Sequence, residues 1–111
     1  MKQVDGISSI SLAELREMSR RMDDYLVKAV VDIEREIIAV DAELHSDLED
    51  VLLENGSEQK NVWGINIYID DDEIEFDSLI NIRPNQNNRS RSVEDAVIRS
   101  DIENVVRKWI L

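Results

Sequence analysis

Four polar side chains at alternate positions form the first candidate set for chemistry in this sequence. Asp41, Glu43, His45 and Asp47 are each separated by one intervening residue. On a β-strand, alternate side chains leave the same face, so this set would gather three carboxylates and one imidazole. Such donors suit a divalent cation, Mn²⁺, Zn²⁺ or Mg²⁺. The pattern predicts a metal or acid–base site on Glu43, His45 and Asp47, with a solvated polar face as the alternative.

A second candidate lies on the polar face of a predicted hairpin. Apolar residues alternate with polar ones over 62–69, and the alternation resumes over 74–83 after an acidic turn. A turn centred on Asp71 and Asp72 would pair Asn66 with Asp77 and Tyr68 with Glu75. The predicted ligand-binding residues on this face are Asn66, Tyr68, Asp77, Asn81 and Arg83. Together they could hold a polar ligand, with Asp77 and His45 as the candidate catalytic residues; cross-strand pairing that only fixes the register is the alternative.

Three arginines lie in a segment without acids. Arg83, Arg89 and Arg91 fall between Asp77 and Glu94, although the chain is otherwise rich in carboxylates. A guanidinium binds phosphate or carboxylate with two parallel hydrogen bonds. The segment therefore predicts a site for a small anion, and ion pairs with the acidic residues 70–73 or with Glu43 are the alternative.

Composition limits the classes of partner. The 111 residues include 25 acids and 13 Lys or Arg, for a net charge of −12. This charge argues against general nucleic-acid binding and against anionic membranes, and it favours cationic partners. There is no Cys, no apolar run long enough to span a membrane and no apolar N-terminal stretch typical of a signal peptide. We expect a single cytoplasmic domain over residues 1–111.

The elements that must position these residues differ in clarity. Ser11 to Glu14 form a capping box, which predicts a helix over roughly 12–24, and residues 3–9 are compatible with a short edge strand. Val and Ile make up half of residues 27–40, which favours strands over 27–45. The apolar residues from Leu26 to Leu44 also follow a heptad spacing, so one helix from 12 to 50 is the alternative.

Turns and caps organise the rest of the chain. Asn55-Gly56 suits a type I′ turn between strands at 51–54 and 57–60. Pro84 would end the second strand of the later hairpin, because it has no N–H for the ladder. A polar loop over 84–92 is followed by a final helix that Ser92 or Asp95 would cap.

Several segments together resemble a known family. They are KAVVD (28–32), ELHSD (43–47), ENGS (54–57), WGINIY (63–68), EFDSLINIRP (75–84) and NRSRSVED (88–95). In this combination the chain resembles short archaeal and bacterial proteins classed only as a domain of unknown function. The resemblance implies glycines near Glu36, Asp41, Ala42 and Asn87, which suit turns and favour strands over 27–45. It implies no activity.

The combined prediction is a two-layer α+β domain. A mostly antiparallel meander of about five strands would carry an N-terminal and a C-terminal helix on one face. Because no motif is catalytically specific, we predict a binding or interaction module for a small anionic or polar ligand or a protein partner, as a monomer or a homodimer. The alternative is a small metal-assisted hydrolase or phosphoryl-handling enzyme that uses Glu43, His45, Asp47, Asp77 and Arg83. A divalent metal is the one cofactor that the pattern suits.

Overall fold

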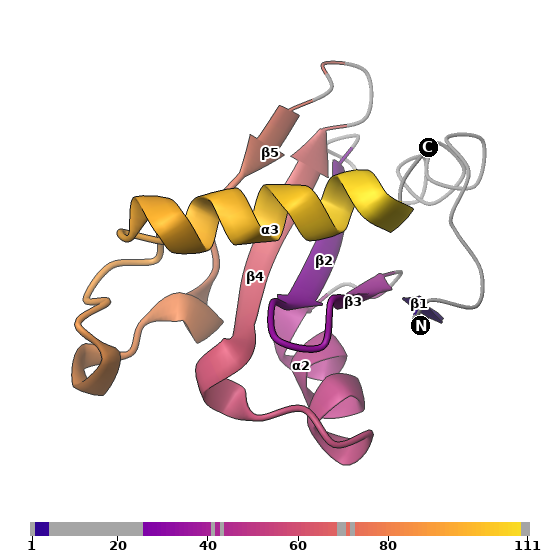
Figure 1. The fold of residues 1–111 in the computed structure, drawn as a ribbon, viewed down its shortest axis with the longest axis horizontal. Helices are drawn as coiled ribbons and strands as arrows, with labels where there is room; N and C mark the ends of the chain where they lie inside the picture. The colour runs from indigo at the N-terminus through magenta and orange to yellow at the C-terminus, as the bar shows by residue number, and fades with distance from the viewer. Residues whose placement is uncertain are drawn as a thin grey trace.

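The fold combines an antiparallel sheet with helices (Figure 1). The computed structural model describes residues 2–4, 26–40, 42, 44–68, 71 and 73–109. The strands are β1 (Lys2–Val4), β2 (Leu26–Asp32), β3 (Ile37–Val40), β4 (Val62–Tyr68) and β5 (Glu73–Glu75). The helices are α2 (His45–Glu54) and α3 (Ala96–Trp109), with short 3₁₀ turns η1 (Gln59–Asn61), η2 (Leu79–Asn81) and η3 (Pro84–Gln86). The helix predicted over 12–24 lies outside the described residues.

The strands pair in the order β1-β3-β2-β4-β5, and every pair is antiparallel. The predicted α+β class with an antiparallel sheet is therefore confirmed, and so are the strands predicted within 27–40. The connectivity is not a simple meander, because β1 lies beside β3 and α2 intervenes between β3 and β4. The turn between β2 and β3 contains Glu36 at φ 54°, one of the positions where the family resemblance implies glycine.

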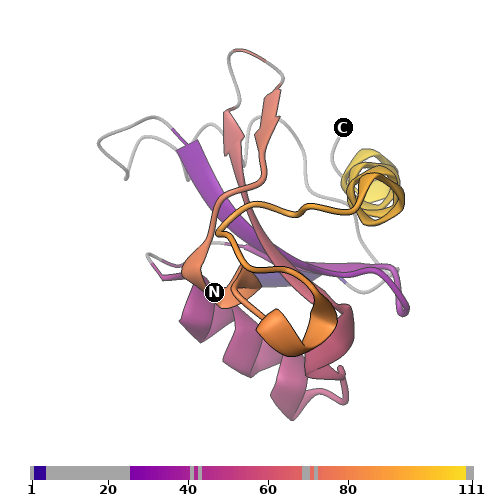
Figure 2. The same cartoon turned by 90° about the vertical axis from the view of Figure 1, so that its left-hand side faces the viewer.

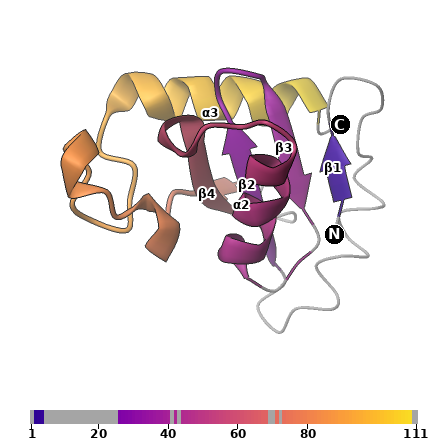
Figure 3. The same ribbon diagram turned by 90° about the horizontal axis from the view of Figure 1, so that it is seen from below.

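The two described helices cover opposite faces of the sheet (Figures 2 and 3). Side chains of Val27, Ala29 and Val31 on β2 pack into one core with Ile102, Val105 and Val106 of α3. The intervening Val30 packs on the other face with Leu48 and Leu52 of α2. A central strand that is apolar on both faces needs a cover on each side. Helix α2 was not predicted from the sequence. The predicted placement of an N-terminal and a C-terminal helix on one face stays a prediction, because residues 12–24 lie outside the described residues.

The strands predicted at 51–54 and 57–60 do not form. Residues 51–54 are the last turn of α2, and η1 begins at Gln59. Leu48 and Leu52 are four residues apart and fully buried on the sheet side, which is the period of a helix and not of a strand. Asn55 and Gly56 end this helix: Gly56 has φ 101°, and the N–H groups of Gly56 and Ser57 donate to the carbonyls of Leu53 and Leu52. This is a Schellman cap, so the predicted type I′ hairpin at Asn55-Gly56 is wrong.

The hairpin predicted after β4 is present, but it is shorter than predicted. Its register pairs Asn66 with Glu75 and Tyr68 with Glu73, two residues from the predicted pairing, and β5 ends at Glu75. Beyond β5, the Asn81 side chain makes the hydrogen bonds to β4 that a paired strand would make. Its amide oxygen accepts from the Gly64 N–H (2.8 Å), and its amide NH₂ donates to the Gly64 carbonyl (2.9 Å). Pro84 therefore begins η3 and does not end a strand.

Helix α3 confirms the predicted C-terminal helix. The Asp95 carboxylate accepts from the N–H groups of Val97 (2.7 Å) and Ile98 (3.3 Å), as an N-cap does. Within the described part of the chain, no helix is long and apolar enough to cross a membrane.

Candidate functional site

A pocket of about 210 Å³ lies where α2 begins, beside the chain that follows β5. Its lining residues are Lys28, Leu44, His45, Ser46, Ser78, Leu79, Ile80 and Arg91. Two of them are cationic, two carry hydroxyls, and none of the described lining residues is a carboxylate. In a chain with 25 acids, such a lining marks this pocket as the place best suited to an anion.

The start of α2 adds positive polarity to the pocket. The first N–H groups of a helix have no partner within the helix and carry the positive end of its dipole. The N-cap residue is Leu44, whose side chain holds no oxygen to accept from them. Ser46 follows in the first turn and lines the pocket. Backbone donors and a hydroxyl donor are therefore available at one end of the site.

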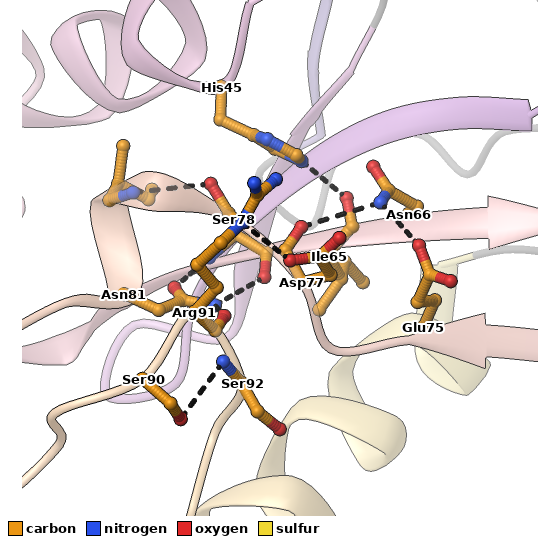
Figure 4. A network of polar contacts seen from close by, with 12 residues as sticks. His45, Ile65, Asn66, Glu75, Asp77, Ser78, Asn81, Ser90, Arg91 and Ser92 are labelled. Carbon is orange, nitrogen blue, oxygen red and sulfur yellow. Dashed lines mark hydrogen bonds and ion pairs between the residues drawn. The ribbon is translucent and has the colours of Figure 1, made fainter.

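His45 makes a hydrogen bond to the backbone of Ile65, which fixes its tautomer; Figure 4 shows the contact. Its Nε2 lies 2.7 Å from the backbone oxygen of Ile65. A carbonyl oxygen only accepts, so Nε2 carries the proton and Nδ1 carries the lone pair. Burial lowers the pKa of His45 below its usual 6.5, against the raising effect of the Ile65 carbonyl. The imidazole is therefore neutral at pH 7 and contributes an acceptor, not a charge.

Arg91 is brought to the pocket by the loop after η3. Its Nε lies 2.8 Å from Oδ1 of Asp77, and both side chains are partly exposed. The Arg91 carbonyl accepts from the Ser78 N–H and from the Asn81 amide, each at 3.0 Å (Figure 4). These contacts fix the backbone of Arg91 against the chain after β5, while its guanidinium keeps further donors at the mouth of the pocket.

The polar face of the hairpin continues from this pocket. Asn66 donates to Glu75 Oε1 (2.9 Å) and to the Asp77 carbonyl (3.3 Å), and it lies opposite Lys28 on β2. Tyr68 O–H lies 3.5 Å from the same Glu75 oxygen. The structure thus gathers Asn66, Tyr68 and Asp77 near one another, as the sequence predicted, although through a different register.

Three other predicted ligand residues are placed elsewhere. Asn81 is fully buried, with its amide committed to the backbone of Gly64 and Arg91. Arg83 is only 6% exposed, and its guanidinium donates to backbone carbonyls and pairs with Glu49 at 3.4 Å. Arg89 is exposed, and its backbone N–H donates to Glu94. Of the three arginines, the structure brings only Arg91 to the pocket.

The predicted metal set does not form on a strand. β3 ends at Val40 and α2 begins at His45, and residues two apart on a helix point about 200° from each other. His45 and Asp47 therefore leave α2 in nearly opposite directions, while Asp41 and Glu43 lie outside the described residues. Among the residues that the structure describes, no three His, Cys, Asp or Glu side chains are grouped so that they could hold a metal ion.

Three polar residues of the pocket were not predicted from the sequence: Lys28, Ser46 and Ser78. A signal existed for Lys28, because it interrupts the apolar run of a central strand, where an unpartnered lysine is costly. Ser46 and Ser78 gave no signal, since their importance depends on the start of α2 and on the turn after β5.

The fold and the pocket define an α+β domain with a small, cation-lined site at a helix N-terminus. The family model described as "Protein of unknown function (DUF5674)" matches residues 7–109, so the chain belongs to this family. No curated protein and no solved structure matches the chain.

Proposed function

We propose that this protein is a binding domain for a small organic anion that carries a phosphate or carboxylate group. The observation that carries the proposal is the lining of the pocket at the start of α2: Lys28, Arg91, two serine hydroxyls and first-turn amides, with no described carboxylate. Each charge-assisted hydrogen bond contributes about 1.5–3 kcal/mol.

The rim of the pocket supports an organic ligand. Leu44 and Leu79 line it and are 55% and 68% exposed. Their exposed apolar surface would cover a nonpolar group attached to the anion. The volume of about 210 Å³ suits a small molecule, and the net charge of −12 opposes long polyanions such as RNA or DNA. We expect a dissociation constant in the micromolar to millimolar range, since a few hydrogen bonds must offset the entropy of association.

Titration with phenyl phosphate, followed by amide NMR shifts, tests the proposal. The amide signals of His45, Ser46 and Ser78 should shift and saturate, and phenol, which has no charge, should leave them unchanged. Lys28→Gln should weaken binding about tenfold or more, because one lost charge-assisted bond exceeds 1.4 kcal/mol.

The matched control is Lys60→Gln. Lys60 is exposed and lies in η1, beyond the other end of α2, so the same loss of charge there should change the affinity less than twofold. Equal weakening by both variants would show a general charge effect and contradict the proposed site. Absence of saturable shifts at His45, Ser46 and Ser78 would also contradict it.

A phosphoryl-handling enzyme is the second candidate, favoured by one observation. The neutral His45 presents an Nδ1 lone pair beside the anion pocket, which is what a general base requires. Turnover of p-nitrophenyl phosphate with added Mn²⁺, lost in His45→Gln, would select this candidate. Binding to a protein partner, dimer formation and a cytoplasmic location stay predictions from the sequence.

A further inference from the structure

The pocket at the start of α2 contains one side-chain atom that can only accept a hydrogen bond, Nδ1 of His45. Because Nε2 of this ring donates to the Ile65 carbonyl (2.7 Å), the lone pair is on Nδ1. Burial lowers the pKa of His45 below 6.5, so the ring is neutral and keeps this lone pair at pH 7. Among the described side chains of the lining, the two cations only donate and the two serine hydroxyls can do either.

The Nδ1 atom has no partner within the protein, and solvent reaches it. In the described part of the chain, the buried side-chain polar atoms without a hydrogen bond belong to Asp32, Trp63 and Asn66. Nδ1 of His45 is not one of them, and no described donor bonds to it, so the atom is exposed to solvent. His45 is only partly buried and lines the pocket. A ligand in the pocket can therefore reach this acceptor.

The two cations of the pocket lie near the same lone pair. Figure 4 shows the Arg91 side chain extending from its loop towards the His45 ring, with Asp77 Oδ1 bound to its Nε at 2.8 Å. Lys28 and Arg91 both act on His45 through their charge, and in each case they oppose its protonation, which lowers the pKa. An anion that these cations bind is therefore close to Nδ1, and an oxygen without a proton would face the lone pair unfavourably.

We propose that the ligand of this pocket is a 2-hydroxy carboxylate, whose carboxylate accepts from Lys28 and Arg91 and whose hydroxyl donates to Nδ1 of His45. The proposal rests on the anion site of the proposed function and specifies its ligand. A hydroxyl beside a carboxylate matches an acceptor beside two cations. A phosphate monoester is mostly a dianion at pH 7, without a proton to donate, and an amino acid would bring its ammonium group against both cations.

Three ligands that differ only at the hydroxyl test the proposal. Mandelate, phenylacetate and 2-methoxy-2-phenylacetate share a carboxylate and a phenyl ring, and each is titrated at pH 7 and constant ionic strength with the amide NMR signals of His45, Ser46 and Ser78 as the readout. The tighter-binding enantiomer of mandelate should bind about fivefold more tightly than phenylacetate, which is the effect of one hydrogen bond between neutral groups. The methoxy compound cannot donate, so it should bind no more tightly than phenylacetate.

Titration with phenyl phosphate separates failure of this proposal from failure of the proposed function. If phenyl phosphate binds saturably but mandelate and phenylacetate bind equally, the hydroxyl contact is overturned and the anion site stands. If phenyl phosphate causes no saturable shift, both are overturned.

Replacement of the ring localises the contact. His45→Phe keeps a flat ring without a lone pair, so the preference for mandelate over phenylacetate should fall below twofold, while phenyl phosphate still binds within threefold of the unmodified protein. The matched control, Asn104→Phe at an exposed position of α3, should keep the preference. A preference that survives in His45→Phe would overturn the proposal.

A direct measurement on His45 replaces the variant if His45→Phe does not fold. The nitrogen NMR signal of Nδ1 in the unmodified protein responds to a donor at its lone pair. At saturation it should shift more with mandelate than with phenylacetate, and equal shifts would overturn the proposal.

Discussion

Truncation of Arg83 should be among the most damaging single changes in this protein. The side chain is 6% exposed, and its guanidinium donates to the carbonyls of Ile80 (3.1 Å), Gln59 (2.6 Å) and Val62. It also pairs with Glu49 at 3.4 Å, whose carboxylate is itself only 12% exposed. One side chain thus joins α2, η1, β4 and η2.

The expected loss follows from what Arg83→Ala leaves behind. Breaking a buried ion pair costs about 3–5 kcal/mol, because the remaining charge is not compensated. The abandoned carbonyls add to this, although some regain water in the space that the side chain leaves. We expect a loss of about 4 kcal/mol, a large share of the roughly 5–15 kcal/mol typical of a domain. Arg83→Lys keeps the charge but loses the planar fork, so it should lose about half as much.

Urea unfolding followed by tryptophan fluorescence measures these losses. The Arg83 guanidinium lies 4.8 Å from the centre of the Trp63 ring, so the probe reports on the same region. With an m-value of about 1.5 kcal/mol/M, Arg83→Ala should lower the midpoint by about 2.5–3 M. The matched control, Arg89→Ala, removes an exposed guanidinium and should change stability by less than about 0.5 kcal/mol.

A loss below about 1 kcal/mol in Arg83→Ala would refute this reasoning. It would mean that the guanidinium is not needed to satisfy the buried carbonyls. Phenyl phosphate binding in Arg83→Lys is expected to match that of the unmodified protein, because Arg83 does not line the pocket at the start of α2.

Three further changes have definite expected outcomes. Gly64→Ala places a Cβ 2.6 Å from the Cβ of Ser78, so η2 must move, and thermal melting should show a loss of about 1–3 kcal/mol. Glu36→Gly relieves a residue at φ 54°, so its melting temperature should rise, for a gain of about 0.5–1 kcal/mol; a fall would show that the contacts of the Glu36 side chain outweigh the strain. His45→Gln removes a group whose pKa is lowered from 6.5 by burial in the folded state. The stabilisation from neutral His45 is full above pH 6.5 and is lost as the pH falls through the lower folded pKa, so unfolding at pH 7 and pH 5 should show a larger acid loss in the unmodified protein than in the variant.

Local sequence was sufficient to predict several elements of secondary structure. The Val and Ile residues of 27–40 predicted strands because branched side chains suit a pleated surface, and Asp95 predicted the start of α3 because its carboxylate caps the first turn. The family resemblance implies glycine near Glu36 and Asn87, and both residues have the backbone conformation that favours glycine. These are the two non-glycine residues with positive φ among those that the structure describes.

The local structure at Asn55-Gly56 could not be predicted from the sequence, because two different structures require the same residue types there. A type I′ turn and a Schellman cap both place glycine at positive φ. The choice depends on whether residues 45–54 form a helix, and that depends on the sheet surface against which Leu48 and Leu52 pack. The alternation of apolar and polar residues typical of a strand continues up to Leu44, so the sequence did not reveal that the helical period begins immediately afterwards.

The candidate site depended on contacts between distant segments. The hairpin register differs by two residues from the prediction, which leaves the same side chains on the same face but moves each partner. Beyond β5, the close approach of Ser78 to Gly64 and the pairing of the Asn81 amide with its backbone bring Arg91 to the pocket. Nothing in the local sequence distinguishes Arg91 from Arg83, because both are single arginines near polar residues.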